Sequence, residues 1–151
     1  MQGMIAHHAQ ALVMTDLIPA RTGSEVIRTL GRRIEVSQKD EIARMRHWLE
    51  ARGEAVPEGH SHGALMPGML TDEDLARLAG ATGAEFDRLF LEYMIRHHEG
   101  ALVMVADLFS TEGAELGPEI FQLASHVDAD QRAEIARMRG MLTTSRQGGT
   151  D

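Results

Sequence analysis

The segment MIAHHAQALVM, at residues 4–14, returns ninety residues later as MIRHHEGALVM, at residues 94–104. Eight of the eleven positions are identical, including both histidines and the methionine at each end. A second pair of segments repeats in the same order, QKDEIARMRHWL at 38–49 and QRAEIARMRGML at 131–142. Two long segments that are each used twice indicate a duplicated pair of helices.

The repeat predicts an all-α protein, an antiparallel four-helix bundle built from two repeated helix pairs about an approximate two-fold axis. Hydrophobic periodicity and boundary signals place the long helices at about residues 1–18, 24–52, 84–112 and 118–144. We expect one domain at 1–144, made of repeat one at 1–53, a linker with a short helix at 54–83, and repeat two at 84–144. Residues 145–151 are expected to form a disordered tail.

Local signals mark where several of these helices begin and end. Thr22 with Glu25 predicts a capping box at the start of the second long helix, and Thr71 with Asp74 predicts another at the start of the short linker helix. Gly53 predicts the end of the second long helix, because glycine readily adopts the left-handed conformation there.

The composition excludes several classes of partner. The 151 residues carry a net charge of −8 and include no cysteine, so disulfides and thiolate ligands are absent. The chain has no basic block, which makes nucleic acid an unfavourable partner. No apolar run reaches the length of a membrane-spanning helix, so we expect no membrane insertion.

The repeated histidines face the core of the predicted bundle. At about 100° per residue, His97 lies about 60° to one side of Met94 and His98 about 40° to the other. His7 and His8 take the same places in the first repeat. The following helix of each repeat also turns polar groups inward, namely Gln38, Glu41, Gln131 and Glu134. Buried charges are costly unless they are paired, so this duplicated set suggests a purpose.

Two interpretations of this polar core stay open. In one, the histidines donate to Glu41 and Glu134 or to main-chain carbonyls and form a satisfied buried network without metal. In the other they ligate a metal, and thioether sulfur favours Cu(I), with Ag(I) as its congener, over Zn(II) or Mg(II). Because imidazole must be neutral to ligate, binding should weaken below pH of about 6.

The metal interpretation assigns each residue a place. The ligands in the two repeats would be His7, His8, Met14, His97, His98 and Met104. The residues that orient them or pack beside them would be Gln38, Glu41, Met45, Gln131, Glu134 and Met138.

The linker carries a second concentration of ligand side chains. Within HSHGALMPGM, residues 60–69, stand His60, His62, Met66 and Met69. On a segment without regular helix, such a density suits a mobile strand that captures copper. The alternative is a surface loop that tucks its methionines over the end of the bundle.

These motifs resemble the family named domain of unknown function 305. The similar elements are M-I-x-H-H-x-x-A-x-x-M at 4–14 and 94–104, Q-x-x-E-I-x-x-M at 38–45 and 131–138, and Met-Pro-Gly-Met at 66–69. The resemblance implies a ferritin-like four-helix bundle, found in secreted, periplasmic or membrane-anchored bacterial proteins. It also implies that some members bind Cu(I) or Ag(I) and contribute to copper resistance.

Three functions therefore compete. The resemblance and the ligand set favour a non-catalytic protein that binds or buffers copper. A metal-free helical interaction module with buried His/Glu networks is the alternative. A di-iron or di-manganese oxidase is disfavoured, because that chemistry uses Glu-x-x-His pairs and the chain has none.

The start of the chain raises a separate expectation. The apolar lead-in at residues 86–93 has no counterpart before Met4, which indicates that a longer natural protein continues upstream. If the natural chain starts at Met1, a second subunit would cover that end of the bundle and the protein would be a homo-oligomer.

Overall fold

The computed structural model describes residues 1–57, 66–111 and 117–147, with side chains described as far as residue 144. Every regular element within these ranges is a helix, so the predicted all-α class is confirmed. The helices are α1 (Gln2–Asp16), α2 (Ile18–Arg21), α3 (Glu25–Glu50), α4 (Asp72–Gly80), α5 (Gly83–Ser110) and α6 (Pro118–Gln147).

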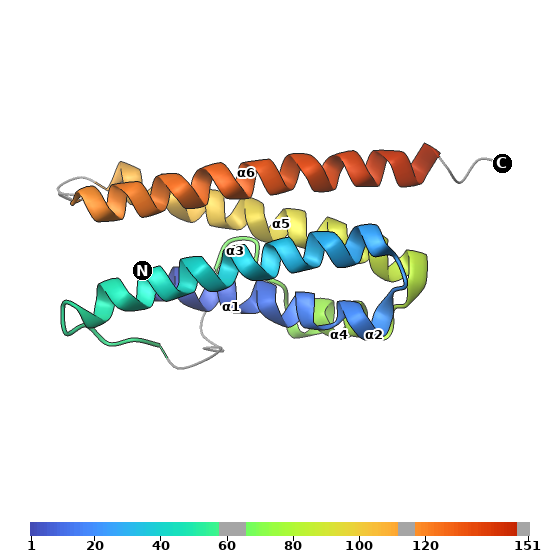
Figure 1. Cartoon of the computed structure of the whole chain (residues 1–151), viewed down its shortest axis with the longest axis horizontal. Coiled ribbons are helices and arrows are strands. Elements are labelled where there is room, and N and C mark those ends of the chain that lie inside the picture. The colour runs from blue at the N-terminus through green and yellow to red at the C-terminus, as the bar shows by residue number, and fades with distance from the viewer. Residues whose placement is uncertain (58–65, 112–116, 148–151) are drawn as a thin grey trace.

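The four long helices pack as two antiparallel pairs (Figure 1). Helix α3 runs back along α1, and α6 runs back along α5. Contacts between α1 and α5 and between α3 and α6 join the pairs, while the short α4 packs on α5. The repeated segments thus occupy α1 with α5 and α3 with α6, as the sequence predicts. The finer expectations, a ferritin-like arrangement and the superposition of the two halves, stay predictions.

The end of the first helix lies slightly before its expected position, and the predicted capping box of the second long helix is wrong. Helix α1 ends at Asp16, because Pro19 lacks the main-chain N–H that would continue the helix, and the chain restarts as the short α2. The cap of α3 is Ser24, whose side chain accepts from the N–H of Ile27, so the predicted capping box of Thr22 is not formed. Thr22 instead accepts a hydrogen bond from the N–H of Ser24.

Other boundary signals are confirmed. The capping box of Thr71 and Asp74 is present in both directions. Gly53, at φ +65°, follows the end of α3, where the N–H of Glu54 donates to the carbonyl of Leu49. Helix α6 begins at Pro118, which suits a first helical turn.

The C-terminal end of α6 differs from the expectation. The helix continues to Gln147, so residues 145–147 of the predicted disordered tail are helical. The hydroxyls of Thr143 and Thr144 donate to the carbonyls of Arg139 and Gly140. Both side chains therefore form hydrogen bonds within their own helix. Residues 148–151 of the predicted tail lie outside the described residues.

The core has different packing at its two ends. One apolar cluster gathers Met14, Met94 and Met138 around Phe86 and Phe90. A second cluster contains Ile5, Met45 and Leu49, with Met1 and Met4 packed against it. Along α1, His7 and His8 lie between Met4 and Met14, so a polar layer separates the two apolar regions.

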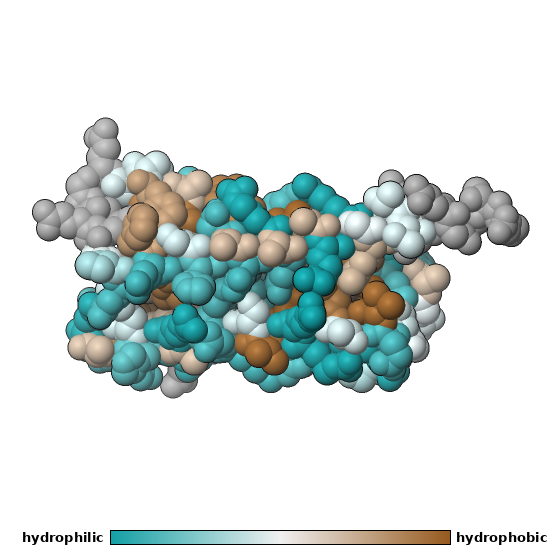
Figure 2. All heavy atoms as spheres, turned by 45° about the horizontal axis from the view of Figure 1, so that its top comes forward, coloured by the Kyte–Doolittle hydropathy of each residue, from teal (hydrophilic) through white to brown (hydrophobic). Residues whose placement is uncertain are grey.

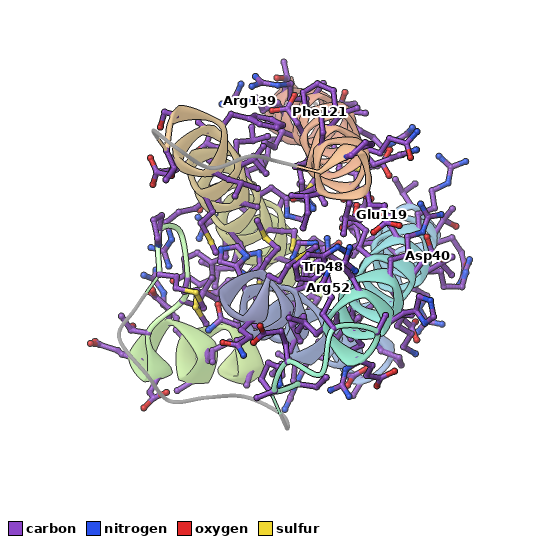
Figure 3. The ribbon with its side chains drawn as sticks, turned by 90° about the vertical axis from the view of Figure 1, so that its left-hand side faces the viewer. Asp40, Trp48, Arg52, Glu119, Phe121 and Arg139 are labelled. Atoms are coloured by element: carbon purple, nitrogen blue, oxygen red, sulfur yellow. The ribbon has the colours of Figure 1, made fainter. Side chains whose placement is uncertain are left out.

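The outer surface is mostly polar. Figure 2 shows hydrophilic side chains over most of the visible face, with small apolar patches between them. Figure 3 shows Trp48 and Arg52 on α3 beside Glu119 on α6. Arg52 lies over the Trp48 ring, 4.1 Å from its centroid, and pairs with Glu119 at 2.9 Å, which links α3 to α6. Among the described helices, none combines the length and apolar character needed to span a membrane.

Candidate metal centre

The centre of the bundle contains four buried imidazoles, His7 and His8 on α1 and His97 and His98 on α5. No more than 1% of any of them is exposed. We call these four residues the central histidines. The sequence prediction that they face the core is confirmed.

Each central histidine uses its Nε2 atom in a hydrogen bond. Nε2 of His8 lies 2.5 Å from the Glu41 carboxylate, and Nε2 of His98 lies 2.6 Å from the Glu134 carboxylate. Nε2 of His7 lies 3.0 Å from the carbonyl oxygen of Pro67, and Nε2 of His97 lies 3.0 Å from that of His7.

The chemistry of these partners assigns the tautomer of the rings. Carbonyl oxygens and ionised carboxylates can only accept hydrogen bonds, so each Nε2 must carry the hydrogen and donate it. In a neutral ring the other nitrogen, Nδ1, then bears a lone pair. The Nδ1 atoms of all four central histidines are buried and find no hydrogen-bond partner among the described residues.

Burial also keeps two of the four rings neutral, those of His7 and His97. Removal from water lowers the pKa of His7 to about 4, opposed by its hydrogen bond to Pro67 and reinforced by the neighbouring His8 and His98. Burial lowers the pKa of His97 well below its usual value, and the nearby His7, His98 and His8 act in the same direction. At neutral pH these two imidazoles are therefore in the form that can ligate a metal.

The rings of each consecutive pair are far enough apart to admit an ion between them. The ring centroids of His7 and His8 lie 6.3 Å apart, and those of His97 and His98 lie 6.1 Å apart. Two imidazoles that bind one ion in a line, each by a bond of about 2.0 Å, would have ring centroids about 6 Å apart. The ring centroids of His7 and His97 lie only 3.9 Å apart, so these two rings pack on each other and leave no gap for an ion.

The Met-Pro-Gly-Met linker is packed against both repeats. The carbonyl of Pro67 lies against Gly100 of α5, where an added Cβ would come within 1.9 Å of it. Gly68 adopts φ +76° at this approach. Further along the linker, the side-chain amide of Gln10 donates to the carbonyl of Leu70 and accepts from its N–H. The linker is therefore fixed between α1 and α5, beside His7.

This docking brings one predicted sulfur ligand close to another. A Cβ built on Gly3 would meet the sulfur of Met66 at 3.3 Å and the methyl carbon of Met104 at 3.7 Å. Gly3 precedes His7 by one helical turn, so both methionines lie on the side of α1 that carries the central histidines. Met69 is half-buried and its N–H donates to the carbonyl of Met66.

The remaining predicted residues fall into three groups. Met14, Met45 and Met138 are fully buried in the apolar clusters, where they pack. Gln38 and Gln131 are buried, and neither end of either side-chain amide has a partner among the described residues. His60 and His62 lie outside the described residues.

The imidazoles and carboxylates alone do not form a larger cluster. Within residues 1–57, 66–111 and 117–147, no group of three or more His, Asp or Glu side chains is arranged to hold a metal. An ion at the central histidines would therefore take two nitrogens from one pair, completed by thioether sulfur or left two-coordinate.

Sequence reasoning missed the contribution of the linker backbone. The carbonyl of Pro67 holds His7, yet no side-chain pattern predicts a main-chain acceptor. A signal was present in the repeat, because Gly100 stands where the first repeat has Gln10. A glycine that replaces a larger residue inside a helix indicates a close approach by another segment.

These features define an all-helical protein with two buried pairs of consecutive histidines. The chain belongs to the family Domain of unknown function (DUF305), whose family profile matches residues 1–147. The search of curated proteins finds no match.

Solved structures of the same family are similar over nearly the whole chain. A DUF305 fragment from Deinococcus radiodurans is 33% identical with a TM-score of 0.84, covering 95% of this chain and 92% of that one. A DUF305 protein from Streptomyces coelicolor, whose name suggests secretion, is 28% identical with a TM-score of 0.80, covering 93% and 88%.

A third similar protein was solved with metal bound. CopM in its Cu(I)-bound form is 29% identical to this chain with a TM-score of 0.73, and the match covers 95% of each chain. CopM structures with Cu(II) and with silver are also similar, at 30% and 28% identity.

Proposed function

We propose that this protein binds a soft monovalent cation, Cu(I) and also Ag(I), at the central histidines. The observation that carries the proposal is the set of four buried Nδ1 lone pairs. An acceptor nitrogen without a partner is costly inside a protein, and a metal ion would satisfy it. The similarity to CopM, which was solved with Cu(I) and silver, supports the same class of ion.

The partners of Nε2 have a defined part in this proposal. Metal-ligating histidines usually donate their other N–H to a carboxylate or a main-chain carbonyl, which fixes the ring and raises its basicity. Glu41 and Glu134 would serve His8 and His98 in this way, and the carbonyls of Pro67 and His7 would serve the other two rings. The two equivalent pairs, His7 with His8 and His97 with His98, would each supply two nitrogens.

Thioether sulfur would set the preference among metals. Met66 and Met69 stand on the docked linker within two residues of Pro67, whose carbonyl accepts from His7, and are candidates for sulfur ligation. His60 and His62 on the same linker would be further ligands. Sulfur of this kind contributes strongly to a Cu(I) site and almost nothing to a Zn(II) or Mg(II) site. Met14 and Met104 were predicted as ligands from their place in the motif, and that role stays a prediction.

The cellular role that fits this chemistry is copper buffering, and so copper homeostasis or resistance, without catalysis. We place the protein outside the cytoplasm, as a secreted, periplasmic or membrane-anchored protein. This placement is supported by the family and by the name of the Streptomyces coelicolor protein.

One observation favours a second candidate, the metal-free interaction module. Each central histidine already has one satisfied nitrogen, and two of them are paired with carboxylates at 2.5 and 2.6 Å. Buried water molecules that donate to the Nδ1 atoms would complete such a network. The two candidates therefore differ in what occupies the space beside Nδ1.

A competition titration separates the two candidates. The untagged protein is titrated against a colorimetric Cu(I) chelator under reducing conditions, beside a variant with His8→Gln and His98→Gln. We expect the parent to withdraw Cu(I) from the chelator and the variant to do so much less. Circular dichroism checks that the variant keeps its helices. If the parent leaves the chelator fully loaded, the metal-free module is the better account.

A further inference from the structure

A groove of about 690 Å³ lies between α3 and α6. One wall comes from residues 29–44 of α3, and the other comes from Leu123, His126 and Asp130 of α6. Figure 3 shows α4 on one side of the bundle and α3 with α6 on the opposite side. This space, which we call the α3–α6 groove, therefore lies away from α4 and the docked linker.

The groove reaches a residue that holds one of the central histidines. Glu41 is among its lining residues, although only 4% of this residue is exposed. One carboxylate oxygen of Glu41 lies 2.5 Å from Nε2 of His8. The other oxygen, Oε1, is buried and has no hydrogen-bond partner among the described residues. Such an oxygen is costly inside a protein, so a positively charged group that meets it would be stabilised.

A further carboxylate stands at the entrance of the groove. Asp130 of α6 is exposed and lines the groove. Partial removal from water raises the pKa of Asp130, and the carboxylates of Glu41 and Glu134 raise it further, while His126 and Arg44 act in the opposite direction. Glu41 and Glu134 are therefore close enough to act on the charge of Asp130, and all three would attract a cation at this entrance.

Other approaches to the polar layer are covered by main chain or by apolar side chains. On the linker side, the Pro67 carbonyl accepts from His7 and lies so close to Gly100 that an added Cβ would come within 1.9 Å of it. Along the bundle, apolar clusters lie on either side of the layer. A cation that loses its water among apolar side chains pays a large desolvation cost. The groove instead offers an approach along polar groups.

We propose that cations reach and leave the central histidines through the α3–α6 groove, where Asp130 captures them and Glu41 passes them to His8. The proposal rests on the proposed function and adds the route to it. A cleft lined by charge of the opposite sign raises the rate at which an ion is captured. Because the described carboxylates and imidazoles include no cluster arranged to hold a metal, these groups bind the ion briefly and release it inward.

The repeat indicates where the groove can be blocked. The equivalent of Asp130 in the first repeat is Ser37, and both residues line the groove, one from each wall. The side chain of Ser37 is small, and no hydrogen bond is described for its hydroxyl. A larger side chain at residue 37 would therefore fill the groove and leave Asp130 and Glu41 unchanged.

The first experiment measures how fast Cu(I) leaves the protein. Cu(I)-loaded protein is mixed in a stopped-flow instrument with a colorimetric Cu(I) chelator, at concentrations where the rate no longer depends on the chelator. In Ser37→Phe the added ring occupies the groove. The matched control, Ala136→Phe, places the same ring on the exposed face of α6, outside the groove lining. Because a blocked route slows entry and exit equally, we expect Ser37→Phe to release Cu(I) several-fold more slowly at unchanged affinity.

The control Ala136→Phe should release Cu(I) at the rate of the parent, and circular dichroism checks that both variants keep their helices. Two results would overturn the route. Release from Ser37→Phe at the rate of the parent would show that the ion leaves elsewhere. A loss of affinity without slower release would make residue 37 part of the binding site and not of its entrance.

The second experiment removes the capturing charge without filling the groove, so it decides the question if Ser37→Phe fails to fold. The loading rate constant follows from the release rate and the Kd. We expect Asp130→Asn to load about three- to tenfold more slowly at low salt, with a smaller difference at high salt because the attraction is screened. Asp128→Asn, which removes a carboxylate paired with Arg132 on the same helix, should load like the parent. Equal loading by the two variants would contradict the role of Asp130.

A third measurement separates the route from the proposed function. If the parent takes no Cu(I) from the chelator, the proposed function fails, and access through the groove is then measured without metal. Exchange of the histidine Cε1 hydrogens in D₂O, followed by mass spectrometry, reports how readily solvent reaches each ring. We expect slower exchange at His8 in Ser37→Phe than in the parent and in Ala136→Phe. Equal exchange rates at His8 in all of these proteins would overturn the route.

Discussion

His97 donates its Nε2 hydrogen to the main-chain carbonyl oxygen of His7, over 3.0 Å, and the two rings lie 3.9 Å apart at 37°. This contact joins α1 to α5 at the centre of the bundle. The equivalent hydrogen of His7 goes to the carbonyl of Pro67 instead. In a symmetric arrangement, His7 would donate to the carbonyl of His97 on α5. The carbonyl of Pro67 on the linker takes that place.

The apo protein should lose stability on mild acidification. The pKa of His7 is about 4 in the folded chain, against an ordinary value of 6.5 for histidine, because burial disfavours the charged ring. As the pH falls from about 6.5 to about 4, the unfolded chain takes up the proton first, so stability present above this window is lost within it. The contribution of His7 is on the order of 3 kcal/mol.

Chemical denaturation at a series of pH values measures this effect. The variant His7→Asn should show a flatter dependence of the unfolding free energy on pH between about 6.5 and 4 than the parent. His126→Gln, outside the polar layer, serves as the control and should follow the parent. Identical slopes for the parent and His7→Asn would contradict the assigned pKa. For the same reason, ligation through His7 should survive below the pH of about 6 that the sequence alone predicts.

Neutralising the carboxylate beside His8 should weaken Cu(I) binding. Glu41→Gln keeps the size and an acceptor oxygen but removes the charge that orients and polarises the ring. Loss of such a partner typically costs about 10- to 100-fold in metal affinity. The chelator competition measures this change. Glu35→Gln, on the same helix but paired with Lys39 at the surface, should leave the affinity unchanged. A similar loss in both variants would remove the special role of Glu41.

A methyl group at residue 100 should displace the linker. In Gly100→Ala the new Cβ would lie 1.9 Å from the carbonyl oxygen of Pro67, and main chain cannot yield cheaply. We expect a loss of about 1–3 kcal/mol in unfolding free energy. Gly140→Ala is the matched control, since this exposed glycine of α6 has nothing within 4 Å of the Cβ position.

The control should raise stability by about 0.5–1 kcal/mol, because alanine favours the helix more than glycine does. Thermal or chemical denaturation of both variants provides the comparison. If Gly100→Ala is as stable as Gly140→Ala, the linker does not dock on α5 as described.

The sequence predicted the parts of this structure that follow from local periodicity. The repeat placed the equivalent segments on α1 with α5 and on α3 with α6. The same angular argument turned Glu41 and Glu134 inward, and the structure pairs them with His8 and His98. These predictions succeeded because burial of a helical face depends on spacing within one element.

The contacts that the sequence could not predict depend on segments distant in the chain. Met14 and Met104 hold the same position in the motif, yet Met14 is packed in the apolar cluster and Met104 lines a pocket. The difference comes from their neighbours, which include Phe86 and Phe90 only at the end of Met14. The main-chain contact between Pro67 and Gly100 likewise joins two segments that helical periodicity does not relate.

The central claim is that the central histidines bind the ion through Nδ1 while Nε2 stays protonated. Long-range ¹H–¹⁵N NMR of the histidine side chains, recorded before and after addition of Ag(I), tests it directly because it distinguishes the two ring nitrogens. We predict Nε2–H tautomers for His7, His8, His97 and His98 in the apo protein, and a large ¹⁵N shift on ion binding at Nδ1 alone. Ligation through Nε2, or Nδ1 resonances that do not respond to Ag(I), would contradict the account.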